Sequence, residues 1–145
     1  MLKDSATTPI LLIGAQKAGS TYLFRLISQH SAIARAKLKE PKILSKPMYD
    51  GTHFLSHFNI EPGHSAVLDG SVSYLHVPGT AERAAAQLGR DIPILAVLRD
   101  PVARAVSGYL HQVKHGRELR YPQDAFALPN SMNDAVMEEE SAILQ

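Results

Sequence analysis

The chain has 145 residues, of which 45% are hydrophobic and 20% are charged, and its formal net charge is +1. This balance is that of an ordinary globular protein, so we expect a single domain over residues 1–145. A net charge this small gives no broad polyanion-binding surface, and we expect no nucleic-acid partner. Because the sequence contains no cysteine, disulfides, thiolate catalysis and cysteine-ligated zinc are excluded.

Charge is distributed unevenly along the chain. Residues 1–60 carry eight Lys and Arg against three Asp and Glu, whereas residues 61–145 carry seven against eleven. A basic N-terminal part suits an anionic ligand, although ordinary surface charge gives the same count. The longest early apolar run, Ile10–Ile13, is too short for a membrane span or a signal-peptide core. We therefore expect a soluble, cytoplasmic protein without a membrane span.

The first predicted elements are a strand, a loop and a helix. Pro9–Gly14 is a short continuous apolar run, which is typical of a strand buried on both faces of a parallel sheet. Ala15–Ser20 is a loop rich in small residues, and Thr21–Gln29 has helical spacing with Ser20 or Thr21 as the expected N-cap. This order indicates the opening of an α/β nucleotide-binding fold.

The later elements continue the alternation of strands and helices. The pattern predicts a basic loop or short strand over Ser31–Lys46, a short helix over Thr52–Phe58, a strand over Ala66–Asp69, a helix over Thr80–Leu88, a strand over Ile92–Leu98 and a helix from Pro101 to His115. Asp100 is the expected N-cap of the last helix. Because Tyr121–Gln145 has weak periodicity, we expect the fold to be incomplete at its C-terminus.

The loop Gly14–Thr21 has the composition of a cradle for phosphate or sulfate. Its small residues let backbone N–H groups approach an anion, the helix that follows adds a partial positive charge, and Lys17 adds a full one. A Walker A loop places its Lys after the final Gly, whereas Lys17 precedes Gly19. The alternative is a tight strand-to-helix turn with an incidental Lys.

The sequence Gln16-Lys17-Ala18-Gly19-Ser20-Thr21 resembles the 5′-phosphosulfate-binding loop of sulfotransferases that use 3′-phosphoadenosine 5′-phosphosulfate (PAPS), most of all the heparan-sulfate-type enzymes and their bacterial relatives. The resemblance implies a P-loop-like three-layer α/β fold with a central parallel sheet flanked by helices. It also implies that the donor is bound by Gln16, Lys17, Ala18, Gly19, Ser20 and Thr21. Lys17 would stabilise the negative charge that develops on the leaving phosphate.

A second motif lies between a predicted strand and a predicted helix. Leu98–Tyr109 resembles the family's 3′-phosphate-binding segment, which implies that Arg99 and Ser107 bind that phosphate. Ser107 lies about two helical turns after Arg99, and a guanidinium and a hydroxyl can hold one phosphate from two sides. We interpret Arg104 as a residue that packs against or braces the helix.

The candidate general base lies between the two motifs. Lys39-Glu40-Pro41-Lys42 resembles the family's Lys-Glu segment, which implies that Glu40 removes the acceptor's proton. The alternative is a solvated Glu in a basic loop. Relatives often carry an acidic-Lys-Ser/Thr-Pro-x-Tyr segment where this chain has Asp69–Tyr74, and here Gly70 stands in place of the Lys.

Together these features predict an enzyme that moves a sulfonyl group from PAPS to a hydroxyl or amine of an acceptor, without a metal. Carbohydrate is one candidate for the acceptor. Two alternatives stay open: a P-loop nucleotide kinase or NTPase that binds ATP with Mg²⁺, and a nucleotide-binding fragment without catalysis. The sequence leaves the oligomeric state open.

Overall fold

The computed structural model describes residues 7–47 and 53–127. Within these residues the strands are β1 (Thr8–Gly14), β2 (Ile33–Arg35), β3 (Ala66–Asp69) and β4 (Ile94–Ala96). The α-helices are α1 (Ser20–Ile27), α2 (Thr80–Leu88), α3 (Pro101–Lys114) and α4 (Pro122–Ala125), and the 3₁₀ helices are η2 (Ile43–Ser45), η3 (Phe54–His57) and η4 (Val72–Leu75). The chain divides into two compact units, Met1–Arg104 and Ala105–Gln145, and each is described by itself.

The first unit is built on a parallel sheet with the strand order β2-β3-β1-β4. β1 lies between β3 and β4, and its Leu11 pairs with Asp69 on one side and with Ile94 on the other. A continuous apolar strand suits this central place because both of its faces are covered. The parallel α/β sheet expected from the sequence is therefore confirmed.

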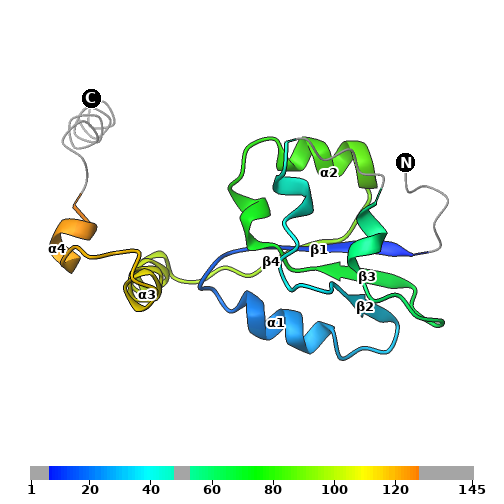
Figure 1. The fold of residues 1–145 in the computed structure, drawn as a ribbon, viewed down its shortest axis with the longest axis horizontal. Helices are drawn as coiled ribbons and strands as arrows, with labels where there is room; N and C mark the ends of the chain where they lie inside the picture. Colours follow the sequence, from blue (N-terminus) through cyan, green and yellow to red (C-terminus); the bar gives the residue numbers. More distant parts are fainter. Residues whose placement is uncertain (1–6, 48–52, 128–145) are drawn as a thin grey trace, which may run out of the picture. The chain divides into compact units, whose positions relative to one another are not determined.

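Successive residues of β1 face two separate cores. Leu12 packs with Phe24 of α1 and with Leu68 on one face of the sheet. Leu11 packs on the other face, in a cluster that contains Ala84 of α2 and Tyr74 of η4. Figure 1 shows the same division, with α1 and α2 on opposite sides of the sheet. The layers are thus helix, sheet and helix, as the sequence predicts.

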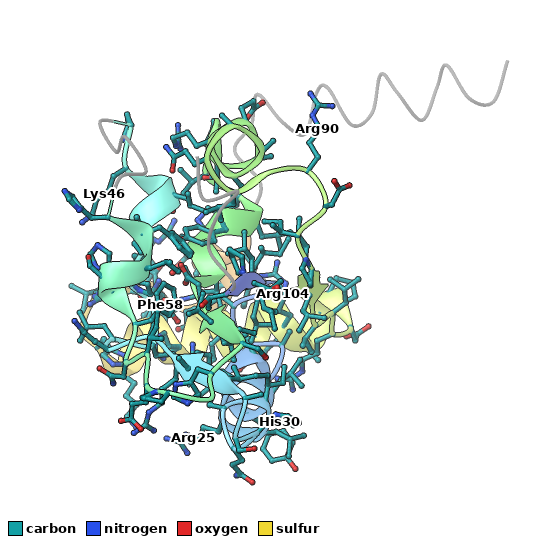
Figure 2. The ribbon with its side chains drawn as sticks, turned by 90° about the vertical axis from the view of Figure 1, so that its right-hand side faces the viewer. Arg25, His30, Lys46, Phe58, Arg90 and Arg104 are labelled. Atoms are coloured by element: carbon teal, nitrogen blue, oxygen red, sulfur yellow. The ribbon has the colours of Figure 1, made fainter. Side chains whose placement is uncertain are left out.

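The first unit has a pair of packed aromatic rings in its core and exposed basic side chains on its surface. Phe58 is buried, and its ring lies 5.0 Å from that of Phe54 in the α2-side core. The basic side chains of Lys46 and Arg90 are exposed, and in Figure 2 both project outward from the packed interior. Because both side chains extend into solvent, we expect substitutions at Lys46 and Arg90 to have little effect on stability, and we use them as controls.

Three predicted features of the first unit have clear outcomes. The strand Ala66–Asp69 and the helix Thr80–Leu88 have the predicted bounds. The prediction of Ser20 or Thr21 as the N-cap of α1 is wrong, because the helix already begins at Ser20 and Gly19 is its N-cap, with φ 104° and no side-chain capping bond. A left-handed backbone at a glycine turns the chain into the helix at that point.

β4 is shorter than predicted. The expected strand Ile92–Leu98 is reduced to Ile94–Ala96, and its pairing with β1 shifts between Leu12 and Gly14. Within the described residues, β4 pairs with β1 alone. An edge strand has fewer neighbours to fix its backbone, so an apolar run need not be ordered as a strand over its whole length.

Helix α3 begins where the sequence predicts. The N–H of Ala103 donates to Asp100 Oδ1 at 2.8 Å, which confirms Asp100 as the cap. In the second unit, the ring of Tyr109 lies 5.4 Å from that of Phe126, which follows α4. Of the weakly periodic Tyr121–Gln145, residues 128–145 lie outside the described residues. No helix within residues 7–47 and 53–127 is long and apolar enough to cross a bilayer.

Candidate functional site

The loop between β1 and α1 is held at its start by Val97, the residue that follows β4. Ala15 N donates to Val97 O and Val97 N donates to Gly14 O, both at 2.8 Å. Lys17 then has φ 65° and Gly19 has φ 104°, so the chain passes through two left-handed positions before the helix. A Cβ on Gly19 would meet nothing within 4 Å, so backbone conformation and not space favours glycine there.

The loop presents a mixed set of groups to a ligand. Gln16, Gly19 and Thr21 are exposed and Lys17 is half-buried, whereas Ser20 is buried at the first position of α1. The first N–H groups of a helix have no partner within it, and the helix dipole is positive at this end. Lys17 and these N–H groups therefore provide positive charge and hydrogen-bond donors for an anion at the start of α1.

The second motif meets this loop. Arg99 Nη1 donates to the carbonyl oxygen of Lys17 at 3.2 Å, a contact between residues 82 positions apart in the sequence. The strand order makes this possible, because β1 and β4 are neighbours and parallel strands end at the same edge of a sheet. Ser107 lies on α3 in the second unit, and its approach to the same ligand stays a prediction.

A cavity of about 350 Å³ opens beside the loop, at the carboxyl ends of β1 and β4. Its lining includes Gln16, Leu75, His76, Arg99 and Arg104, and none of the described residues that line it is an Asp or a Glu. Two guanidinium groups on an apolar wall create a positive potential that attracts an anionic ligand. Crevices at the carboxyl ends of parallel strands are common ligand sites in folds of this class.

Sequence reasoning missed two members of this cavity. No local sequence pattern around His76 indicated that it lies at the site. Arg104, interpreted as a helix brace, lines the cavity together with Pro101. The three-residue spacing places these two on one face of α3, and that spacing was the available signal.

Glu40 lies outside this cavity lining. Its carboxylate Oε1 accepts a hydrogen bond from Lys39 Nζ at 2.8 Å, and both side chains are about one-third exposed, 30% and 27%. Lys39 Nζ lies 6.0 Å from the centre of the Phe24 ring on α1. The candidate base is thus ion-paired beside the helix that follows the loop, and its contact with an acceptor stays a prediction.

A buried polar cluster lies at the end of β3. Burial raises the pKa of Asp69 above its ordinary value, and hydrogen bonds from Ser71 and Tyr74 offset part of that rise. Burial, and next the charge of Asp69, raise the pKa of Tyr74. The adjacent Gly70 is required by packing, since a Cβ there would lie 2.6 Å from Phe24 Cδ2.

Metal ligands do not gather in the described part of the chain. Within residues 7–47 and 53–127 no group of three or more His, Asp or Glu side chains is arranged to hold a metal ion.

Comparison with known proteins gives a consistent result. The sequence profile of the family described as "Sulfotransferase domain" matches residues 7–142. A solved sulfotransferase from Alicyclobacillus acidocaldarius matches with a TM-score of 0.70 and 33% identity, covering 79% of this chain and 53% of that one.

Two curated relatives match over shorter shares of their own length. The human bifunctional heparan sulfate N-deacetylase/N-sulfotransferase 2 is 30% identical over 115 residues, 73% of this chain and 13% of the relative. The membrane-associated sulfotransferase kil1 of Dictyostelium discoideum is 26% identical over 117 residues, 77% of this chain and 24% of the relative. The chain therefore spans a minor part of both curated relatives and about half of the solved one.

Proposed function

This chain belongs to the sulfotransferase domain family, and from that premise we propose that it transfers a sulfonyl group from PAPS to a hydroxyl or amine of an acceptor. The observation that most supports the proposal is the hydrogen bond from Arg99 to the carbonyl of Lys17, because it joins the two anion-binding motifs at one site. A donor with a phosphosulfate at one end and a second phosphate at the other needs two such groups of cations.

The residues present fit this donor. The loop from Gly14 to Thr21 supplies helix N–H groups and the Lys17 ammonium for the 5′-phosphosulfate. Arg99 supplies a guanidinium for the 3′-phosphate, and Arg104 lines the same cavity. A contact of Ser107 with the 3′-phosphate stays a prediction that rests on the sequence resemblance.

The proposed chemistry assigns one role to each catalytic residue. Transfer breaks the bond between sulfur and the bridging phosphate oxygen, forms a bond between sulfur and the acceptor oxygen or nitrogen, and releases adenosine 3′,5′-bisphosphate. Lys17 stabilises the charge on the departing phosphate. Glu40 takes the acceptor's proton, and its carboxylate Oε1 is held by the hydrogen bond from Lys39 Nζ at 2.8 Å.

Carbohydrate is the proposed acceptor class, because one relative is named as a heparan sulfate N-sulfotransferase. Transfer of labelled sulfonyl from PAPS to N-desulfated heparan, compared with a simple phenol and an aliphatic alcohol, tests this choice. Preference for the phenol would redirect the proposal to small-molecule acceptors.

Calorimetry tests the donor assignment. The full chain is titrated with adenosine 3′,5′-bisphosphate, with AMP, and with ATP plus Mg²⁺. We expect the bisphosphate to bind at least about tenfold more tightly than AMP, because charged hydrogen bonds to the extra phosphate contribute about 1.5–3 kcal/mol. Equal or tighter binding of ATP with Mg²⁺ would favour the kinase or NTPase alternative, and tight bisphosphate binding without transfer would favour the non-catalytic one.

A further inference from the structure

Asp69 is a carboxylate at the end of β3 with 0% of its surface exposed. Its Oδ1 accepts hydrogen bonds from Ser71 N at 3.0 Å and Ser71 Oγ at 2.6 Å, and its Oδ2 accepts one from Tyr74 O–H at 2.7 Å. A buried carboxylate is tolerated only when such partners replace water. Asp69 therefore organises its surroundings, and the proposed chemistry gives it no other task.

The same two hydroxyls bind a distant piece of backbone. Lys42 N donates to Ser71 Oγ at 2.9 Å, and Leu44 N donates to the Tyr74 hydroxyl oxygen at 3.1 Å. A hydroxyl has one proton, so a hydroxyl that donates to Asp69 presents its lone pairs to the N–H groups. The carboxylate thus fixes the direction of two parallel relays, each running from backbone N–H through a hydroxyl to Asp69.

The backbone held by these relays follows directly on Glu40-Pro41. Lys42 has φ 54°, a left-handed position that a non-glycine residue keeps only where its surroundings impose it. Arg83 of α2 adds a third restraint, since its Nε donates to Leu44 O at 2.6 Å. The segment after Glu40 is therefore fixed at several points.

The turn after Asp69 also contacts the loop Gly14–Thr21, the proposed donor loop. A Cβ on Gly14, the last residue of β1, would lie 3.1 Å from Leu75 Cδ2 and 3.4 Å from Val72 O, both in η4. A Cβ on Gly70 would lie 3.2 Å from Lys39 O. One short segment, from Asp69 to Leu75, thus packs against the start of the donor loop and against the segment that carries Glu40.

We propose that Asp69 is a positioning residue: through Ser71 and Tyr74 it holds the Glu40 segment at a set place relative to the donor loop. The role in transfer rests on the proposed function, whereas the relay itself does not. Asp69 touches neither donor nor acceptor in this scheme and acts through Glu40.

Asp69→Asn tests the relay without any activity assay. The substituted amide has one oxygen and one NH₂ group, so it can accept from only one of the two hydroxyls. The other hydroxyl then faces an NH₂ donor and must turn its own proton elsewhere, so its direction is no longer fixed and its hydrogen bond from Lys42 N or Leu44 N weakens. We expect hydrogen exchange at one or both of these amides to become about tenfold faster, with amides of α2 unchanged.

Milder variants keep the test decisive if Asp69→Asn does not fold. Tyr74→Phe should accelerate exchange at Leu44 alone, and Ser71→Ala should do so at Lys42 alone. Ser73→Ala is the matched control, since its hydroxyl lies on the same turn and contacts Ser45 Oγ but not Asp69. Unchanged exchange in both relay variants would overturn the proposal.

Kinetics test the link to Glu40. We expect Asp69→Asn to lower kcat at least about tenfold while the affinity for adenosine 3′,5′-bisphosphate stays within about twofold. In a Glu40→Gln background the same change should cost less than about twofold, because the group it positions is already absent. An equal loss in both backgrounds would overturn the positioning role. Absence of transfer by the wild-type chain would contradict the proposed function, and the exchange result would still decide the relay.

Discussion

The two strand-loop-helix motifs share a local pattern but lie in different parts of the sheet. The first follows β1, which is flanked by β3 and β4, and its Leu12 is completely buried. The second follows β4, which pairs with β1 alone among the described residues, and Ile94 and Leu98 there are 55% and 78% exposed. The first motif is therefore fixed by packing on both faces of its strand, whereas the second packs against the core through Leu95 and Val97 and leaves Ile94 and Leu98 exposed.

This difference separates stability from ligand binding. The donor loop takes its shape from a close-packed strand and helix, so substitutions beneath it should destabilise the fold. The second motif is tied to the loop by Val97 and by the Arg99 side chain, so substitutions there should weaken binding and leave stability nearly unchanged.

The largest expected effect is on stability. Leu12→Ala should lower the free energy of unfolding by about 2–5 kcal/mol, because it leaves a cavity between α1 and the sheet. Leu98→Ala, at an exposed position of the second motif, should change the free energy of unfolding by less than about 0.5 kcal/mol. Urea unfolding followed by circular dichroism measures both. Equal losses would mean that the second motif is packed as tightly as the first.

The next largest effect concerns Lys17. Lys17→Ala should lower kcat by about 10²–10³, the loss seen when one charge-stabilising donor is removed from a transition state. Lys46→Ala, which removes an exposed cation outside the candidate site, is the control and should leave kcat unchanged. Near-normal turnover by the Lys17 variant would rule out its assigned role.

A smaller effect is expected at Arg99. Arg99→Ala should weaken binding of adenosine 3′,5′-bisphosphate by about ten- to a hundredfold, and binding of AMP by less than about twofold. Arg90→Ala, an exposed site in the same unit, should weaken neither. If the affinity for AMP fell as much as the affinity for the bisphosphate, the role of Arg99 would be to hold the loop in place through its hydrogen bond to Lys17 O, and not to bind the 3′-phosphate.

The smallest effect is a pH dependence of stability from Asp69. Its pKa in the folded chain is raised, by burial first and also by the charge of Glu40. The folded state then binds the proton more tightly than the unfolded state. The protonated Asp69 therefore contributes to the free energy of unfolding below the pKa that it has in the unfolded chain, and this contribution is lost as pH rises through its pKa in the folded chain. Urea unfolding over the acidic range should show this downward slope, and Asp69→Asn should flatten it.

Local patterns predicted much of the fold. The bounds of β3 and α2 and the Asp100 cap follow from short-range signals, and the structure has them as predicted. The N-cap of α1 was mispredicted because Gly19 uses backbone conformation where the sequence offered two hydroxyls. The length of β4 was overestimated because an apolar run does not reveal how many strands pair with it, and among residues 7–47 and 53–127 β4 pairs with β1 alone.

The sequence alone predicted the chemistry of the candidate site: an anion-binding loop at Gly14–Thr21 and a second basic motif at Arg99, both of which carry the likeness to sulfotransferases. Tertiary structure decided which groups meet. The contact of Arg99 with Lys17 O, the cavity shared with Arg104, and the relay from Asp69 to Lys42 and Leu44 all join segments far apart in the chain. They depend on the strand order and on how the connecting segments pack, which short-range patterns do not encode.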